Sequence, residues 1–255
     1  MRKVYVLPNL FTTASLFCGL LAMLNIYDAH YEMACTLILI SAVMDALDGQ
    51  IARLTGTQSY FGLNYDSLSD LVAFGVAPAM LIYSWLQAAT GGTAERIATG
   101  VASLYAICGA LRLARFNVQA LRVEKKSFTG LPIPAAAGAV VATFLAFWKM
   151  DFFFDKEDHL FLRFLPIVFI GLSYLMVSNI PYPSLKHIDL ERRKPFDYLV
   201  SVIIILCLIV ALWQMRTLIL FLGFWSYVIW GVLGRLVRVR KPREDTVPQV
   251  SGGKV

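Results

Sequence analysis

The sequence predicts an all-α integral membrane protein with about eight transmembrane helices. Of its 255 residues, 58% are hydrophobic and only 16% are charged, and the mean hydropathy is +0.65. A soluble domain of this length would carry less apolar sequence. The apolar residues also gather into runs of roughly twenty, which is the length that a helix needs to cross a hydrocarbon core of about 30 Å.

Eight apolar runs are predicted to be the transmembrane helices. In chain order they cover residues 9–27, 31–54, 62–89, 97–120, 132–149, 160–179, 197–214 and 216–234. The first run is interpreted as a helix of the mature protein and not as a signal peptide, because Asn9, Thr12 and Ser15 interrupt its apolar sequence. Residues 1–240 are predicted to form one membrane domain, and residues 241–255 a disordered tail.

The basic residues predict the orientation of the chain. With eight spans and a cytoplasmic N-terminus, most of the 23 Lys and Arg residues fall in cytoplasmic segments, as the positive-inside bias requires. Both termini are therefore predicted to be cytoplasmic. Basic loops at an anionic membrane surface account for the net charge of +6, so we expect membrane lipid as a partner and no nucleic acid.

Four aspartates interrupt the second and third runs: Asp45, Asp48, Asp66 and Asp70. Carboxylates within membrane-spanning sequence are costly unless something neutralises them, and they commonly mark functional sites. On a helix with 3.6 residues per turn, each pair shares one face. We therefore expect all four carboxylates to converge at the cytoplasmic end of the second and third helices.

Converging carboxylates repel one another strongly, so the cluster predicts a bound cation. All-oxygen ligation without His or Cys favours magnesium, manganese or calcium over zinc. Small residues beside the acids, Gly49 and Ala52 on the second helix and Gly62, Ala73 and Ala77 on the third, predict that these two helices pack closely. A cation transporter that uses the acids as an ion path remains an alternative to an enzyme.

The acids belong to the pattern D-x2-D-G-x2-A-R-x8-G-x3-D-x3-D, which runs from Asp45 to Asp70. This pattern resembles the signature of the CDP-alcohol phosphotransferase family without a departure. The resemblance implies a transferase that moves a phosphatidyl or similar group from a CDP-linked donor to an alcohol and releases CMP. It also implies a homodimer.

The resemblance assigns roles to the residues of the pattern. Asp45, Asp48 and Asp66 would hold a divalent metal, Mg2+ or Mn2+, against the CDP diphosphate. Asp70 would lie near a second metal and act as the general base. The CDP donor would be bound by Asp45, Gly49, Ala52, Arg53 and Gly62.

Three further segments, residues 9–19, 112–117 and 130–137, resemble the bacterial and archaeal membrane phosphatidylserine synthases within that family. This resemblance implies transfer of the phosphatidyl group from CDP-diacylglycerol to L-serine, in the cytoplasmic membrane of a prokaryote. Glycerol 3-phosphate, choline and inositol phosphate remain alternative acceptors.

Four polar residues outside the pattern are candidates for substrate contact. Arg112 and Arg115 are predicted at the cytoplasmic end of the fourth helix, where a guanidinium could bind the serine carboxylate or the donor phosphate. Either arginine could instead anchor the span. Asn9 and Thr12 could reach the same polar cavity, or could cap the first helix.

Overall fold

The computed structural model describes residues 6–54, 59–90, 95–120, 130–150, 160–180, 182 and 216–239. The helices are α1 (Val6–Tyr27), α2 (Tyr31–Leu54), α3 (Tyr60–Asp70), the π-helical turn η1 (Leu71–Val76), α4 (Ala77–Thr90), α5 (Glu95–Ala120), α6 (Ile133–Met150), α7 (Leu160–Val177) and α9 (Arg216–Val239). No strand occurs in this described part of the chain. The predicted all-α class is therefore confirmed.

The predicted runs agree with the described helices, except that 197–214 lies outside the described residues. The third run is one continuous span, made of α3, η1 and α4. Within the described residues, five helices are long and apolar enough to cross a membrane, at residues 9–27, 31–52, 60–88, 95–118 and 217–234, and two shorter apolar helices cover 133–147 and 164–177. The count of eight stays a prediction, as do the domain limits and the tail at 241–255.

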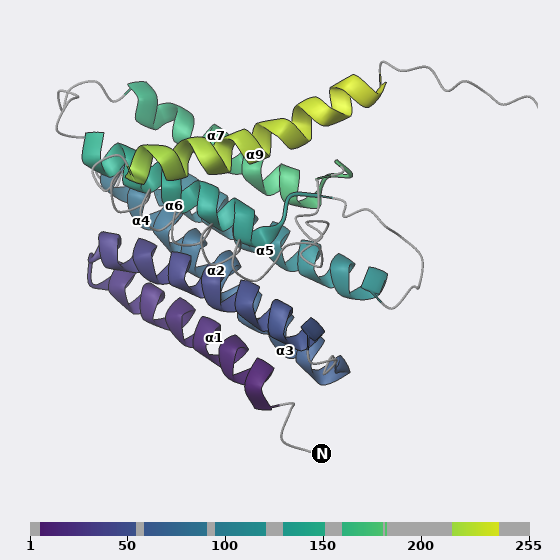
Figure 1. The fold of residues 1–255 in the computed structure, drawn as a ribbon. Coiled ribbons are helices and arrows are strands. Elements are labelled where there is room, and N and C mark those ends of the chain that lie inside the picture. Colours follow the sequence, from purple (N-terminus) through teal and green to yellow (C-terminus); the bar gives the residue numbers. More distant parts are fainter. Residues whose placement is uncertain are drawn as a thin grey trace, which may run out of the picture.

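Helix α6 lies at the centre of the bundle. Its residues 136–144 are all buried, and it contacts α2, α4, α5, α7, η1 and α9. Four of these residues are alanines, so neighbouring helices can approach closely. In Figure 1, α1 and α2 lie side by side at one edge of the bundle, and α9 lies across the opposite edge.

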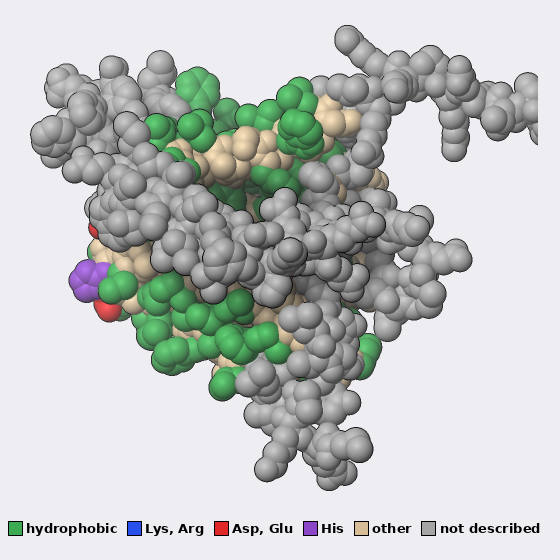
Figure 2. Space-filling model, viewed as in Figure 1, with side chains coloured by type: hydrophobic (Ala, Val, Ile, Leu, Met, Phe, Trp, Pro, Cys, Tyr) green, Lys and Arg blue, Asp and Glu red, His purple; other side chains and the backbone are tan. Residues whose placement is uncertain are grey.

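The outer faces of the helices are apolar. Exposed large side chains include Phe17 and Leu24 on α1, Ile107 on α5, Ile167 on α7 and Trp230 on α9. Figure 2 shows that hydrophobic side chains make up much of the described surface in that view. In water such a surface would be unfavourable, whereas in a bilayer it faces lipid.

One close helix contact that the sequence analysis did not predict joins α1 to η1. A Cβ atom added to Gly19 of α1 would lie 2.8 Å from the Cα of Ala73 in η1, so α1 and η1 touch through their backbones. Helix α1 packs along α2 and also against α3 and η1, whereas direct contact between α2 and α3 is slight. Within the third span, η1 and α4 contact α2 directly, but α3, η1 and α4 all pack more extensively on α1, which therefore also joins the two spans.

Backbone hydrogen bonds hold the segment before α6 against the end of α7. Gly130 has a φ of +90°, and its N–H donates to the carbonyl of Ile180 at 2.8 Å. The N–H of Leu131 donates to the carbonyl of Leu175 at 3.0 Å. The start of α6 is thereby attached to the end of α7.

Candidate active site

Three carboxylates from two helices meet at one point in the bundle. Asp45 lies on α2, and Asp66 and Asp70 lie on α3. One oxygen from each carboxylate lies within 4.8 Å of the oxygens from the other two. Asp70 Oδ1 is buried and has no hydrogen-bond partner among the described residues. Three acids held this close concentrate negative charge that a cation would neutralise.

The donor set fits a hard divalent cation. The three ligand atoms are carboxylate oxygens, and no His or Cys belongs to the group that the described residues form. Oxygen ligands suit Mg2+, Mn2+ and Ca2+, whereas zinc favours nitrogen and sulfur. The unpartnered oxygen of Asp70 is an available ligand or proton acceptor. The cluster is therefore compatible with divalent metal binding.

The fourth acid of the pattern, Asp48, is hydrogen-bonded to helix α1. Its side chain is buried and accepts a hydrogen bond from the Thr12 hydroxyl of α1. It does not belong to the group of three close carboxylates. The structure thus brings together three of the four acids, and metal binding by Asp48 stays a prediction.

Helix α1 holds the two acid-bearing helices in place. Toward α2, the hydroxyls of Ser15 and Ser41 lie 2.7 Å apart, and Ser41 also donates to the carbonyl of Ser15 at 3.0 Å. Toward α3, the Ser69 hydroxyl donates to the carbonyl of Thr12 at 3.1 Å. These buried bonds fix the position of α2 relative to α3, and so of Asp45 relative to the two acids of α3.

Asn9 and Thr12 lie inside α1, which begins at Val6, so neither residue caps the helix. The Asn9 carboxamide oxygen would lie 3.8 Å from a Cβ atom added to Gly62, which places it beside the first turn of α3. One turn further along α1, the hydroxyls of Thr13 and Tyr65 lie 2.9 Å apart. The polar side chains of α1 therefore face the beginning of α3 and the motif acids.

The glycine of the pattern on α2 faces open space. A Cβ atom added to Gly49 would meet no other atom within 4 Å, and Ala52 is half-buried one turn later. The side chain of Arg53 lies outside the described residues. The helix surface next to Asp45 and Asp48 is thus small and accessible, which suits the approach of a ligand.

The two arginines of α5 differ in their surroundings. Asp70 and Asp45 are both among the electrostatic partners of the Arg112 guanidinium. The Arg112 Nε is buried and has no hydrogen-bond partner among the described residues. Arg115 instead donates to the carbonyl of Val177, at 3.3 Å, and to the carboxamide oxygen of Asn179. Arg112 therefore belongs to the acid cluster, whereas Arg115 joins α5 to the end of α7.

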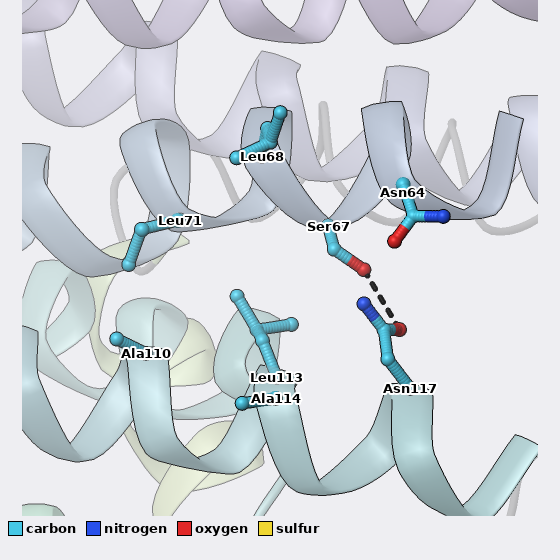
Figure 3. Close-up of a pocket in the computed structure, with 8 residues that line it drawn as sticks. All are labelled: Asn64, Ser67, Leu68, Leu71, Ala110, Leu113, Ala114 and Asn117. Carbon is cyan, nitrogen blue, oxygen red and sulfur yellow. Dashed lines mark hydrogen bonds between the residues drawn. The ribbon is translucent and has the colours of Figure 1, made fainter. Parts of the chain in front are cut away.

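A pocket of about 250 Å³ lies between α3, η1 and α5. Figure 3 shows Asn64, Ser67 and Asn117 at one end of this pocket, and the Ser67 hydroxyl donates to the Asn117 carboxamide oxygen at 3.0 Å. Leucine and alanine line the remainder. No charged side chain lines the pocket, and no motif in the sequence indicated it.

The acid cluster and the arginines of α5 lie in a segment that matches a known protein family. A family model described as CDP-alcohol phosphatidyltransferase matches residues 5–177, which include the acid cluster and both arginines of α5. The chain belongs to the CDP-alcohol phosphatidyltransferase family. This is the family that the spacing of the acids resembled, and its members are enzymes, so the alternative of a cation transporter is not supported.

The relatives of this family member are bacterial and archaeal. The chain is 39% identical over 233 residues to the CDP-diacylglycerol–serine O-phosphatidyltransferase of Helicobacter pylori, covering 91% of this chain and 92% of the relative. It is 41% identical over 179 residues to the archaetidylserine synthase of Methanothermobacter thermautotrophicus, with 69% of each chain covered. It is 35% identical over 210 residues to the CDP-diacylglycerol–serine O-phosphatidyltransferase of Methanocaldococcus jannaschii, covering 82% of this chain and 86% of the relative.

One electrostatic partner of Arg112 was not predicted from the sequence. Tyr227 of α9 is an electrostatic partner of Arg112, although α9 lies beyond the residues that the family model matches. No motif spacing could have identified it, because its sequence separation from Arg112 is large and its surroundings are ordinary apolar helix.

Proposed function

We propose that this family member transfers the phosphatidyl group of CDP-diacylglycerol to L-serine and so makes phosphatidylserine and CMP. The observation that carries this proposal is the group of three converging carboxylates, Asp45, Asp66 and Asp70, within the segment that matches the family. The relatives support serine as the acceptor, since the bacterial and archaeal relatives at 39% and 35% identity are serine phosphatidyltransferases.

Asp45, Asp48, Asp66 and Asp70 are proposed to hold two divalent cations, Mg2+ or Mn2+. Cations bound there would spread the charge of the donor diphosphate and stabilise CMP as it leaves. Gly49, Ala52, Arg53 and Gly62, with Asp45, are proposed to line the CDP site. The open space over Gly49 supports that placement.

Asp70 is proposed to be the general base. Its unpartnered Oδ1 takes the proton from the serine hydroxyl as the serine oxygen attacks the phosphatidyl phosphorus. The bond from that phosphorus to the CMP oxygen breaks, and the proton then passes from Asp70 to water. Direct displacement predicts inversion at phosphorus, whereas retention would indicate a phosphatidyl-enzyme intermediate.

Arg112 is proposed to bind an anionic part of the substrates, because its buried guanidinium has Asp70 and Asp45 as electrostatic partners. Thr12, Asn9 and Arg115 are proposed to shape the same cavity from α1 and α5.

In the membrane we propose eight spans with both termini cytoplasmic, in the cytoplasmic membrane of a prokaryote. The site then lies at the cytoplasmic end of the second and third spans, and the protein is proposed to be a homodimer.

An acceptor screen tests the proposed function. Purified protein in detergent or proteoliposomes is given CDP-diacylglycerol, Mg2+ or Mn2+, and one labelled alcohol at a time: serine, glycerol 3-phosphate, choline or inositol phosphate. We expect CMP release and labelled lipid with serine only. CMP release that depends on another alcohol, with none for serine, would reject the choice of acceptor.

A further inference from the structure

Two hydrogen bonds join α5 to the third span, one before Asp70 in the sequence and one after it. Before Asp70, the Ser67 hydroxyl donates to the Asn117 carboxamide oxygen at 3.0 Å (Figure 3). After Asp70, the Tyr105 hydroxyl donates to the carbonyl of Phe74 at 3.3 Å. Helix α5 therefore holds the third span on both sides of the proposed base.

The bond from Tyr105 supplies a donor that the backbone of η1 lacks. The Ala77 N–H donates to the carbonyl of Val72, five residues earlier, whereas an α-helical N–H donates to the carbonyl four residues earlier. For the Phe74 carbonyl, the α-helical donor would be the N–H of residue 78. That residue is Pro78, which has no N–H. The Phe74 carbonyl instead takes a hydrogen bond from a side chain of α5.

Both partners of this bond lie deep in the bundle. The side chains of Tyr105 and Phe74 are fully buried, and α5 packs along η1. The two backbones are close there, since a Cβ atom added to Gly109 of α5 would lie 3.8 Å from the Cα of Gly75 in η1. A buried carbonyl without a donor is unfavourable. The Tyr105 hydroxyl therefore stabilises the π-helical form of this turn.

Asp70 is the residue that directly precedes this turn. On its other side, the hydroxyl of Ser69 donates to the carbonyl of Thr12. The backbone before Asp70 is thus attached to α1, whereas the backbone after it depends on η1 and α5. A π-helical turn and an α-helical turn direct their side chains differently. The form of η1 therefore affects where the Asp70 carboxylate lies relative to Asp45.

We propose that Tyr105 is a positioning residue for the transfer reaction: its hydroxyl replaces the N–H that Pro78 lacks, and the π-helical turn that it stabilises directs the Asp70 carboxylate toward Asp45 and Asp66. The inference rests on the proposed function, in which Asp70 is the general base. Tyr105 acts through the backbone of η1 and touches neither the substrates nor the metal.

Steady-state kinetics of Tyr105→Phe tests this role, because the substitution removes the hydroxyl and keeps the buried ring. We expect kcat for serine-dependent CMP release to fall about tenfold, since a misplaced base slows the chemical step. The KM values for serine and CDP-diacylglycerol should stay within about twofold. Tyr83→Phe is the matched control. Tyr83 lies on α4, beyond the end of η1, and its hydroxyl accepts from Gln87 at 2.7 Å, so kcat should not change.

Pro78→Ala tests how Tyr105 acts, because it supplies the missing N–H. With that donor present, the kcat loss caused by Tyr105→Phe should shrink to less than about threefold, measured against Pro78→Ala alone. If Tyr105→Phe does not fold, the double variant decides: it should fold and keep the kcat of Pro78→Ala. The inference is overturned by a wild-type kcat in Tyr105→Phe, by an equal loss in Tyr83→Phe, or by failure of Pro78→Ala to reduce the loss.

Binding of Mn2+ to the purified protein, measured by electron paramagnetic resonance, separates this inference from the proposed function, because it needs no substrate. Asp70 is one of the three close carboxylates, so its displacement in Tyr105→Phe should raise the Kd for Mn2+ about tenfold. Tyr83→Phe should bind Mn2+ as the wild type does. An unchanged Kd in Tyr105→Phe would show that Tyr105 does not position Asp70. A wild type that binds Mn2+ but releases no CMP with serine would reject the proposed function, and the Kd comparison would still decide the role of Tyr105.

Discussion

The Thr12 hydroxyl of α1 donates a hydrogen bond to the Asp48 carboxylate of α2, while the Thr12 carbonyl accepts one from Ser69 of α3. A single residue of the first helix therefore contacts both helices that carry the motif acids. The acids are therefore held in place by three helices, although all four come from only two of them.

Thr12→Val tests the contribution of this contact. The substitution keeps the branched shape and removes the hydroxyl, so the buried Asp48 carboxylate loses its donor, at a cost of about 1.5–3 kcal/mol. We expect CMP release to fall at least tenfold. Thr12→Ser keeps the hydroxyl and should remain near wild type. Equal rates for Thr12→Val and wild type would mean that this bond does not support the reaction.

Asp70→Asn should abolish turnover with little effect on donor binding. The amide cannot take the serine proton, and loss of a general base costs about a hundredfold or more in rate. Binding of the CDP-lipid, measured by calorimetry in detergent, should change only a few-fold. Asp28→Asn is the control, because Asp28 is an exposed acid in the turn after α1. Full activity in Asp70→Asn would remove Asp70 as the base.

We expect Asp45→Asn and Asp66→Asn to weaken metal binding. Each removes one charge from the three-carboxylate group, so the Mg2+ or Mn2+ concentration for half-maximal activity should rise about tenfold or more. Donor binding should weaken in parallel. Chelation by EDTA should stop wild-type activity, and added Mn2+ should restore it. An unchanged metal requirement in both variants would place the cation elsewhere.

Gly130→Ala should destabilise the fold without touching the acids. The residue has a φ of +90°, and a Cβ atom there would lie 2.4 Å from the carbonyl oxygen of Met176. We expect a loss of about 1–3 kcal/mol, seen as a lower Tm. Gly171→Ala is the matched control, since a Cβ atom at Gly171 would meet nothing within 4 Å, and its Tm should not fall. Equal Tm values for the two variants would contradict the strain argument.

The sequence predicted the described helices well, because the length of an apolar run is a local property. The run 31–54 coincides with α2, and the run 132–149 differs from α6 by one residue at each end. The motif acids were also predictable, since helical spacing alone places Asp66 and Asp70 on one face of α3.

Relations between distant helices could not be predicted in this way. The position of α1 between the acid-bearing helices depends on Ser69, Thr12 and the close approach of Gly19 to Ala73. None of these contacts has a periodic signature in the sequence. The same holds for the packing of α9 on α6, where the Trp225 indole N–H donates to the Thr143 hydroxyl.

The π-helical turn η1 is a joint within a single membrane span. It separates the acids of α3 from the buried half in α4, where Leu81 and Ile82 are fully buried. In a helix, each residue gained or lost rotates everything beyond it by about 100°. A residue inserted or deleted within η1 would rotate the acid-bearing helix α3 relative to α4 and leave the packing of α4 unchanged. The orientation of the acids and the packing of α4 can therefore change independently as the sequence evolves.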